Sequence, residues 1–183
     1  KEETIIYIFV WAKWCTDHSF CIDPSEEIYI LYFGPSGAVE ETIIPIINAL
    51  GKKFANVVFT QDWHTKHHAS FASTHPGKKP FQTIKLSYGT QVLWPDHCVQ
   101  GSKDAELSSR LYIPHAQLII RKGYHNEVDS YSTFVAADKK TKTGLTGYLM
   151  ERGLTKVYVC GLATDFCVSW SAIDARAADL QGL

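Results

Sequence analysis

Apolar, strand-like runs alternate with helix-like stretches along most of this chain. The predicted strands cover Thr4–Trp11, Asn56–Thr60, Leu118–Arg121 and Lys156–Cys160, and the predicted helices cover Thr42–Leu50, Thr143–Arg152 and Phe166–Leu180. Strands that alternate with helices are joined by right-handed crossovers and pair in parallel. The pattern therefore predicts an α/β fold built on a mainly parallel sheet. Residues 61–115 are predicted to be a long loop rich in histidine, and a loop of that length inside a compact domain is usually functional.

Length and charge restrict the classes of protein to consider. A chain of 183 residues fits one domain, so we expect a single domain over residues 1–183. Its 18 Lys and Arg against 19 Asp and Glu give no basic excess for nucleic acid and no charged tail for a membrane surface. The longest apolar run, Thr4–Ala12, is too short to cross a bilayer, and the preceding Glu2 and Glu3 do not suit a signal peptide. Five widely spaced cysteines, an odd number, indicate free thiols and a cytoplasmic location.

Chemically useful side chains follow three of the predicted strands. Asp62 and His64 follow the second strand, Lys122 ends the third, and Cys167 follows the fourth. In parallel sheets, sites form outside the carboxyl ends of the strands. Segments far apart in sequence are therefore expected to converge on one edge of the sheet.

Cys167 is a candidate nucleophile because it lies where a strand is predicted to lead into a helix. The helix dipole and free N–H groups there would lower the pKa of the thiol and could hold an oxyanion. The alternative is that Cys167 is a small core residue, which is the commoner role of a free cysteine. Cys160 is interpreted as core, and three further cysteines are interpreted as structural: Cys15, Cys21 and Cys98.

Asp62, His64 and His97 form a candidate metal set. Two imidazoles and one carboxylate suit zinc, iron or manganese, with positions left open for water or substrate. The alternative is that these are ordinary surface residues. Lys122 would be solvated at most strand ends, but at a catalytic edge it would stabilise a thiolate. Moving the thiol proton also requires a carboxylate, for which Asp17 and Asp23 are the candidates.

Six ordered segments together carry a family resemblance. They are Thr60–His64, Ser70–Gly77, Val92–Gly101, Ile120–Gly123, Asp129–Ser132 and Gly161–Val168. Over roughly residues 34–182 the chain resembles the nicotinamidase (pyrazinamidase) branch of the isochorismatase-like hydrolases. The resemblance implies a three-layer αβα fold around a six-stranded parallel sheet. It also implies a Cys–Asp–Lys triad beside one divalent metal ion, zinc first with iron or manganese as alternatives, and hydrolysis of nicotinamide or pyrazinamide.

The resemblance assigns roles by motif. Cys167 is implied to be the nucleophile and Lys122 the triad lysine, and the metal ligands are implied to be Asp62, His64 and His97. Three residues are implied to bind the substrate: Trp94 as an aromatic wall, Tyr131 and Leu162. A cis peptide bond is implied between Leu162 and Ala163, which would aim the N–H groups of Ala163 and Cys167 into an oxyanion hole.

Two parts of the chain depart from the family pattern. Residues 1–33 match poorly, because Ser25 and Ile28 stand where the family has Gln and Phe. Asp23 is the preferred triad acid, since it lies 39 residues before Asp62, although the clearest early strand leads to Asp17. The family's last strand and helix have no counterpart before Leu183.

Three functions remain open from the sequence: the nicotinamide amidase, a related hydrolase of another small substrate, and a non-catalytic metal-binding relative. The expected partner is a small-molecule substrate, without nucleic acid or membrane. A homo-oligomer is left open.

Overall fold

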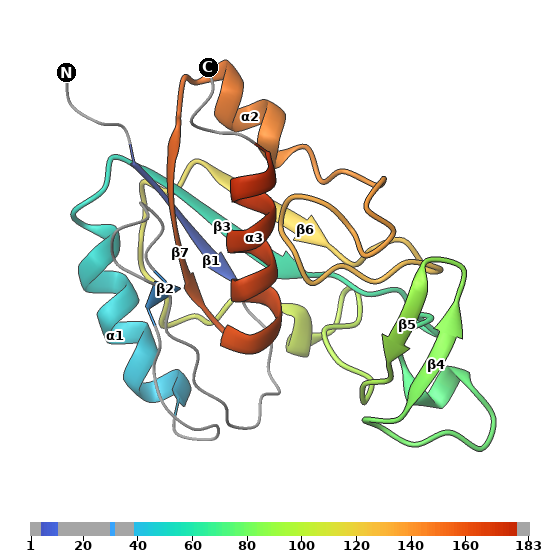
Figure 1. Cartoon of the computed structure of the whole chain (residues 1–183). Coiled ribbons are helices and arrows are strands. Elements are labelled where there is room, and N and C mark those ends of the chain that lie inside the picture. The colour runs from blue at the N-terminus through green and yellow to red at the C-terminus, as the bar shows by residue number, and fades with distance from the viewer. Residues whose placement is uncertain (1–4, 11–29, 32–38, 179–183) are drawn as a thin grey trace.

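The computed structural model describes residues 5–10, 30–31 and 39–178, and these form one parallel sheet with helices packed on it (Figure 1). The strands are β1 (Ile5–Val10), β2 (Ile30–Leu31), β3 (Asn56–Asp62), β6 (Leu118–Lys122) and β7 (Lys156–Gly161). Their order is β2-β7-β1-β3-β6, and every pair is parallel. The predicted parallel α/β fold is confirmed. The described residues supply five strands of this sheet, where six were expected.

Burial along the strands shows which of them lie inside the sheet. All seven residues of β3 are buried, as expected for a strand with neighbours on both sides and helices or loops on both faces. Among the described strands, β6 has a neighbour on one side, and its residues alternate between more buried and exposed. The continuous apolar run of the central strand β1, between β7 and β3, agrees with the same rule.

Two apolar clusters lie on opposite faces of the sheet, which makes the architecture three-layered. One cluster joins Val58 and Val159 to the helices α2 (Leu145–Glu151) and α3 (Ser169–Ala177). The other joins Val57 and Cys160 to α1 (Val39–Gly51). Neighbouring strand residues thus enter different clusters, because successive side chains point to opposite faces. Cys160 is buried in the core, as predicted.

The segment predicted as one long loop contains an antiparallel hairpin. Strands β4 (Thr83–Leu86) and β5 (Gly89–Val92) pair from Thr83–Val92 to Leu86–Gly89, and the hairpin extends away from the main sheet (Figure 1). Both strands are short, and the two residues between them are Ser-Tyr rather than the Asn-Gly or Asp-Gly pairs that mark such turns. The prediction failed here because the sequence contains neither long strand patterns nor a typical turn pair between them.

Several element boundaries also differ from those predicted. Helix α1 begins at Val39, three residues earlier than expected, and the short strand β2 was not predicted. The last helix is preceded by a π-helical turn, Thr164–Val168, so α3 itself begins at Ser169. Two short 3-10 turns complete the elements: η1 (Ala72–Thr74) and η2 (Lys103–Ala105). Among the described helices, none has the length and apolar character needed to cross a membrane.

We predict that Leu149→Ala destabilises the fold by about 2–5 kcal/mol, because the side chain is completely buried between α2 and the sheet and its removal leaves a cavity. Urea unfolding would measure the loss. The neighbouring Met150, 44% exposed on the same helix, is the matched control. Met150→Ala should change the unfolding free energy by less than about 1 kcal/mol. Equal losses in the two variants would contradict the packing described here.

Candidate active site

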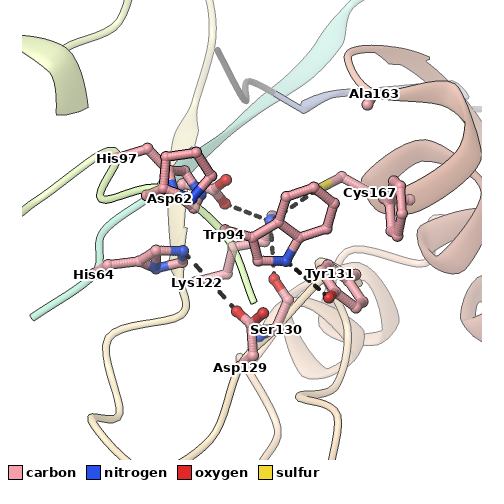
Figure 2. A pocket seen from close by; sticks show the side chains of 12 residues that line it. Asp62, His64, Trp94, His97, Lys122, Asp129, Ser130, Tyr131, Ala163 and Cys167 are labelled. Atoms are coloured by element: carbon pink, nitrogen blue, oxygen red, sulfur yellow. Dashed lines mark hydrogen bonds and ion pairs between the residues drawn. The ribbon is translucent and has the colours of Figure 1, made fainter. Parts of the chain in front are cut away.

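A cavity lies at the carboxyl ends of β3, β6 and β7, where the sequence predicted that functional side chains would converge (Figure 2). Its lining residues are Asp62, His64, Trp94, Pro95, His97, Lys122, Asp129, Ser130, Tyr131, Ala163, Phe166 and Cys167. Eight of the predicted site residues lie in this lining. The site residues that the sequence reasoning gave no role are Asp129, Ser130, Phe166 and Pro95, although all four lie within or next to the segments that carried the resemblance.

Lys122 is buried in the cavity with three partners. It forms an ion pair with Asp62, donates a hydrogen bond to the Ser130 carbonyl (2.9 Å) and donates another to the Sγ atom of Cys167 (3.3 Å). Burial by itself would lower the pKa of Lys122, but the Asp62 carboxylate raises it above its usual value, so the ammonium stays charged. All three ammonium N–H groups therefore have an acceptor.

Cys167 lies within the π-helical turn between β7 and α3, with its side chain 4% exposed. The sequence predicted a lowered thiol pKa at this position, and that prediction was wrong. Burial raises the pKa of Cys167 to about 11, and the nearby Asp62 carboxylate adds to the increase, against the lowering effect of Lys122. The thiol is thus protonated at neutral pH in this arrangement, and a nucleophilic role requires a base.

The predicted metal set comes together in the structure. Ligand atoms of Asp62, His64 and His97 all lie within 4.8 Å of one another. The Nδ1 atom of His64 donates to the Gly123 carbonyl (3.1 Å), and the Nδ1 atom of His97 donates to the Pro95 carbonyl (2.8 Å). Because a carbonyl can only accept, each Nδ1 carries the proton and each Nε2 keeps a lone pair for a cation. Burial, together with His68 and His97, lowers the pKa of His64, which favours the neutral form that binds metals.

Charge in the cavity also suits a cation. Among the described residues, its lining carries the two carboxylates of Asp62 and Asp129 against the single ammonium of Lys122. Both acidic side chains are buried. The described lining therefore has an excess of negative charge that a divalent ion would balance. The residues present fit a metal ion.

His64, His68 and Asp129 form a second group with potential ligand atoms. The rings of His64 and His68 are stacked, with centroids 4.6 Å apart. However, both ring nitrogens of His68 are already used: Nε2 donates to the His125 carbonyl (3.0 Å), and Nδ1 is hydrogen bonded to Ser70 (2.8 Å to Oγ). The group containing His97 is therefore the better metal site.

Gly123 makes room for His64. Its φ angle is +67°, and a Cβ atom added there would lie 2.4 Å from the imidazole Cε1 and 2.5 Å from Nδ1. Glycine at this position thus permits the backbone to pass close to the ring and to accept its hydrogen bond.

Aromatic rings form one wall of the cavity. The ring of Trp94 meets those of Phe166 and Tyr131 edge-on, with centroids 4.9 Å and 6.3 Å away. Trp94 and Tyr131 thus lie where they were predicted. Leu162 does not line the cavity, and its half-buried side chain packs against the α1-side core instead.

The remaining predictions concern the backbone and the triad acid. The peptide bond between Leu162 and Ala163 is cis, as predicted, and Ala163 lines the cavity. Asp17 and Asp23 both lie outside the described residues, as do Cys15 and Cys21. Strand β1, which pairs with β3 and β7, ends at Val10, and Asp17 is the first acidic residue after it in the sequence.

Comparisons with known proteins agree with this geometry. The family model described as "Isochorismatase domain" matches residues 20–181. A nicotinamidase of Acinetobacter baylyi is 60% identical over 153 residues, which span 81% of this chain and 72% of the relative. A solved nicotinamidase/pyrazinamidase of Acinetobacter baumanii has a TM-score of 0.80 at 51% identity, covering 96% of this chain and 78% of its own. A pyrazinamidase of Pyrococcus horikoshii in complex with zinc has a TM-score of 0.65 at 26% identity, covering 98% and 80%.

We predict that Gly123→Ala weakens binding of a divalent metal ion at least about tenfold, because the new methyl group would displace the His64 ring from its orienting carbonyl. Isothermal titration of the metal-free protein with Zn²⁺ would measure this loss.

Gly153 is the matched control, because its φ angle of +65° imposes the same backbone strain while nothing lies within 4 Å of an added Cβ. Gly153→Ala should lower stability but leave zinc affinity unchanged. Unchanged zinc affinity in Gly123→Ala would remove His64 from the metal set.

Proposed function

The chain belongs to the isochorismatase family, and on that basis we propose that it is a cysteine amidohydrolase that converts nicotinamide to nicotinate and ammonia. One observation supports this most directly. The Sγ atom of Cys167 lies 3.3 Å from the buried ammonium of Lys122, in the same cavity as a carboxylate and two imidazoles with metal-ligand geometry. Pyrazinamide, which has the same carboxamide on a similar ring, would be a second substrate.

The reaction begins at Cys167. Its Sγ atom attacks the carboxamide carbon while the thiol proton passes to the triad acid, which delivers it to the departing ammonia. Because the pKa of the thiol is raised to about 11, proton removal must accompany the attack. The fixed charge of Lys122 stabilises the anionic sulfur, and the N–H groups of Ala163 and Cys167 are proposed to hold the oxyanion. Water then hydrolyses the thioester, releasing nicotinate and restoring the thiol.

Asp62, His64 and His97 are proposed to hold one divalent ion, for which zinc is our first choice. When bound, the ion would be a Lewis acid that contacts the pyridine nitrogen of the substrate, directly or through water. Trp94 and Tyr131 are proposed to hold the ring between this end of the cavity and Cys167.

The product and the thiols suggest the setting of the reaction. Nicotinate formation places the chain in NAD salvage. Cys98, Cys160 and Cys167 are free thiols, which supports the cytoplasmic location proposed from the cysteine pattern. The partner is proposed to be a small molecule, and oligomerisation is left open.

We predict that Cys167→Ala lowers ammonia release from nicotinamide by at least about 1,000-fold, because no other thiol lines the described cavity. A coupled ammonia assay, run with and without added zinc, would measure it. Metal content should stay at one ion per chain. Cys160→Ala, in the core away from the cavity, should reduce stability without changing the rate constant. Near-normal turnover in Cys167→Ala would exclude the cysteine mechanism.

We propose Asp23 as the triad acid and predict that Asp23→Asn lowers the rate by orders of magnitude, whereas Asp17→Asn does not. The acid must lie within hydrogen-bond reach of Sγ, so only one of the two can serve. We choose Asp23 because it lies 39 residues before Asp62, the separation that the family resemblance implies. Steady-state assays on both variants decide between them. The reverse result would assign the acid to Asp17, and two fully active variants would place the base elsewhere.

A further inference from the structure

The carboxamide of Gln91 lies behind the wall of the cavity. It bridges the aromatic side of the cavity, at Tyr131, and the acidic side, at Asp129. Gln91 is in β5, where the residues on either side are partly or fully exposed, yet its own side chain is 2% exposed. A buried amide is costly unless it is hydrogen bonded. The contacts of Gln91 therefore show what its burial achieves.

On the aromatic side, the Nε2 atom of Gln91 lies 3.1 Å from the hydroxyl of Tyr131. The same hydroxyl accepts a hydrogen bond from Nε1 of Trp94 (3.0 Å). Tyr131 also lines a second cavity of about 140 Å³, together with Gln91 and Trp170. The Tyr131 ring packs against the rings of Trp94 and Phe166, and these two hydrogen bonds fix the position of its hydroxyl.

On the acidic side, the same Nε2 atom donates to Oδ2 of Asp129 (3.0 Å). The other carboxylate oxygen, Oδ1, accepts from the Ser130 N–H (2.8 Å) and lies 3.9 Å from Nε2 of His64. The amide also lies 2.6 Å from the Val92 carbonyl, so its two protons serve three acceptors. Its orientation is fixed by Tyr88, whose hydroxyl donates to Oε1 of Gln91 (2.9 Å).

We propose that Gln91 is a positioning residue. It sets the position of the aromatic wall relative to the proposed metal site at His64. The pyridine ring of the substrate must contact the aromatic wall and the proposed metal site at the same time. Displacements near 1 Å are enough to impair such a site. The hairpin β4–β5 would thereby be part of the substrate-binding apparatus, although Gln91 does not line the cavity. This inference rests on the proposed nicotinamide hydrolysis for its kinetic test but not for its metal-binding test.

The kinetic test is a double-mutant cycle. Gln91→Met keeps the volume and removes the hydrogen bonds, and it should raise the KM for nicotinamide about tenfold with kcat within about threefold, the pattern of lost ground-state binding. Tyr131→Phe should have a similar effect. The double variant should be no worse than the worse single variant, within about twofold, because both changes break the same connection.

Gln117→Met is the matched control. The Gln117 carboxamide is also doubly hydrogen bonded, to Ala55 and Val57, but it lies at the amino ends of β3 and β6, at the opposite edge of the sheet. This substitution should leave KM unchanged, alone or combined with Tyr131→Phe. A KM change below twofold in a folded Gln91→Met, or effects of Gln91→Met and Tyr131→Phe that multiply, would overturn the proposal.

Two further measurements keep the test decisive. If Gln91→Met does not fold, Tyr88→Phe removes the hydroxyl that orients the amide, and it should raise KM about threefold; no change would overturn the proposal. If the unaltered chain releases no ammonia from nicotinamide, the proposed function fails and zinc affinity decides instead. Gln91→Met should then bind Zn²⁺ about tenfold more weakly, because Asp129 loses its donor beside His64. Unchanged zinc affinity in that case would refute the positioning role.

Discussion

The buried ammonium of Lys122 is the constraint on which the site depends. A charged amine can remain in this interior only because three acceptors surround it, and those acceptors come from β3, from the segment after β6 and from the turn between β7 and α3. Satisfying one charge therefore draws three distant parts of the chain together. The same geometry holds the Cys167 sulfur against a permanent positive charge and holds Asp62 beside the two imidazoles. Asp62 thus belongs both to the ion pair and to the metal set.

Much of this site could be predicted because it depends on topology. Asp62, Lys122 and Cys167 each follow or end a strand with a strong apolar pattern, and parallel pairing places such positions at one edge. The candidate metal site could be predicted from residue types, since one carboxylate and two imidazoles, those of Asp62, His64 and His97, suit a divalent cation. The apolar pattern could not decide between Asp17 and Asp23 as the triad acid, because the segment around them has no matching periodicity. Both residues also lie outside the described part of the chain.

The features that were missed depend on packing rather than on pattern. The thiol pKa of Cys167 was predicted from the helix dipole, but desolvation is the larger effect for a side chain that is 4% exposed. Asp129 and Gln91 are polar residues whose importance depends on their burial, and no local sequence signal distinguishes a buried glutamine from an exposed one. The hairpin that carries Gln91 has an unremarkable two-residue connection, so its pairing could not be predicted either.

The hairpin β4–β5 also contributes to the site separately from the main sheet. Asp62, His64, Lys122 and Cys167 are carried by the ends of the main sheet or by the segments that follow its strands, whereas Trp94 directly follows a hairpin that extends away from that sheet (Figure 1). One ring of the aromatic wall, Trp94, is therefore placed by a different piece of the chain from the groups proposed to react. Substitutions in the hairpin can reshape the binding wall without disturbing the parallel strands that hold the reacting groups. A fold organised in this way can acquire new ring preferences in evolution while its bond-breaking machinery stays the same.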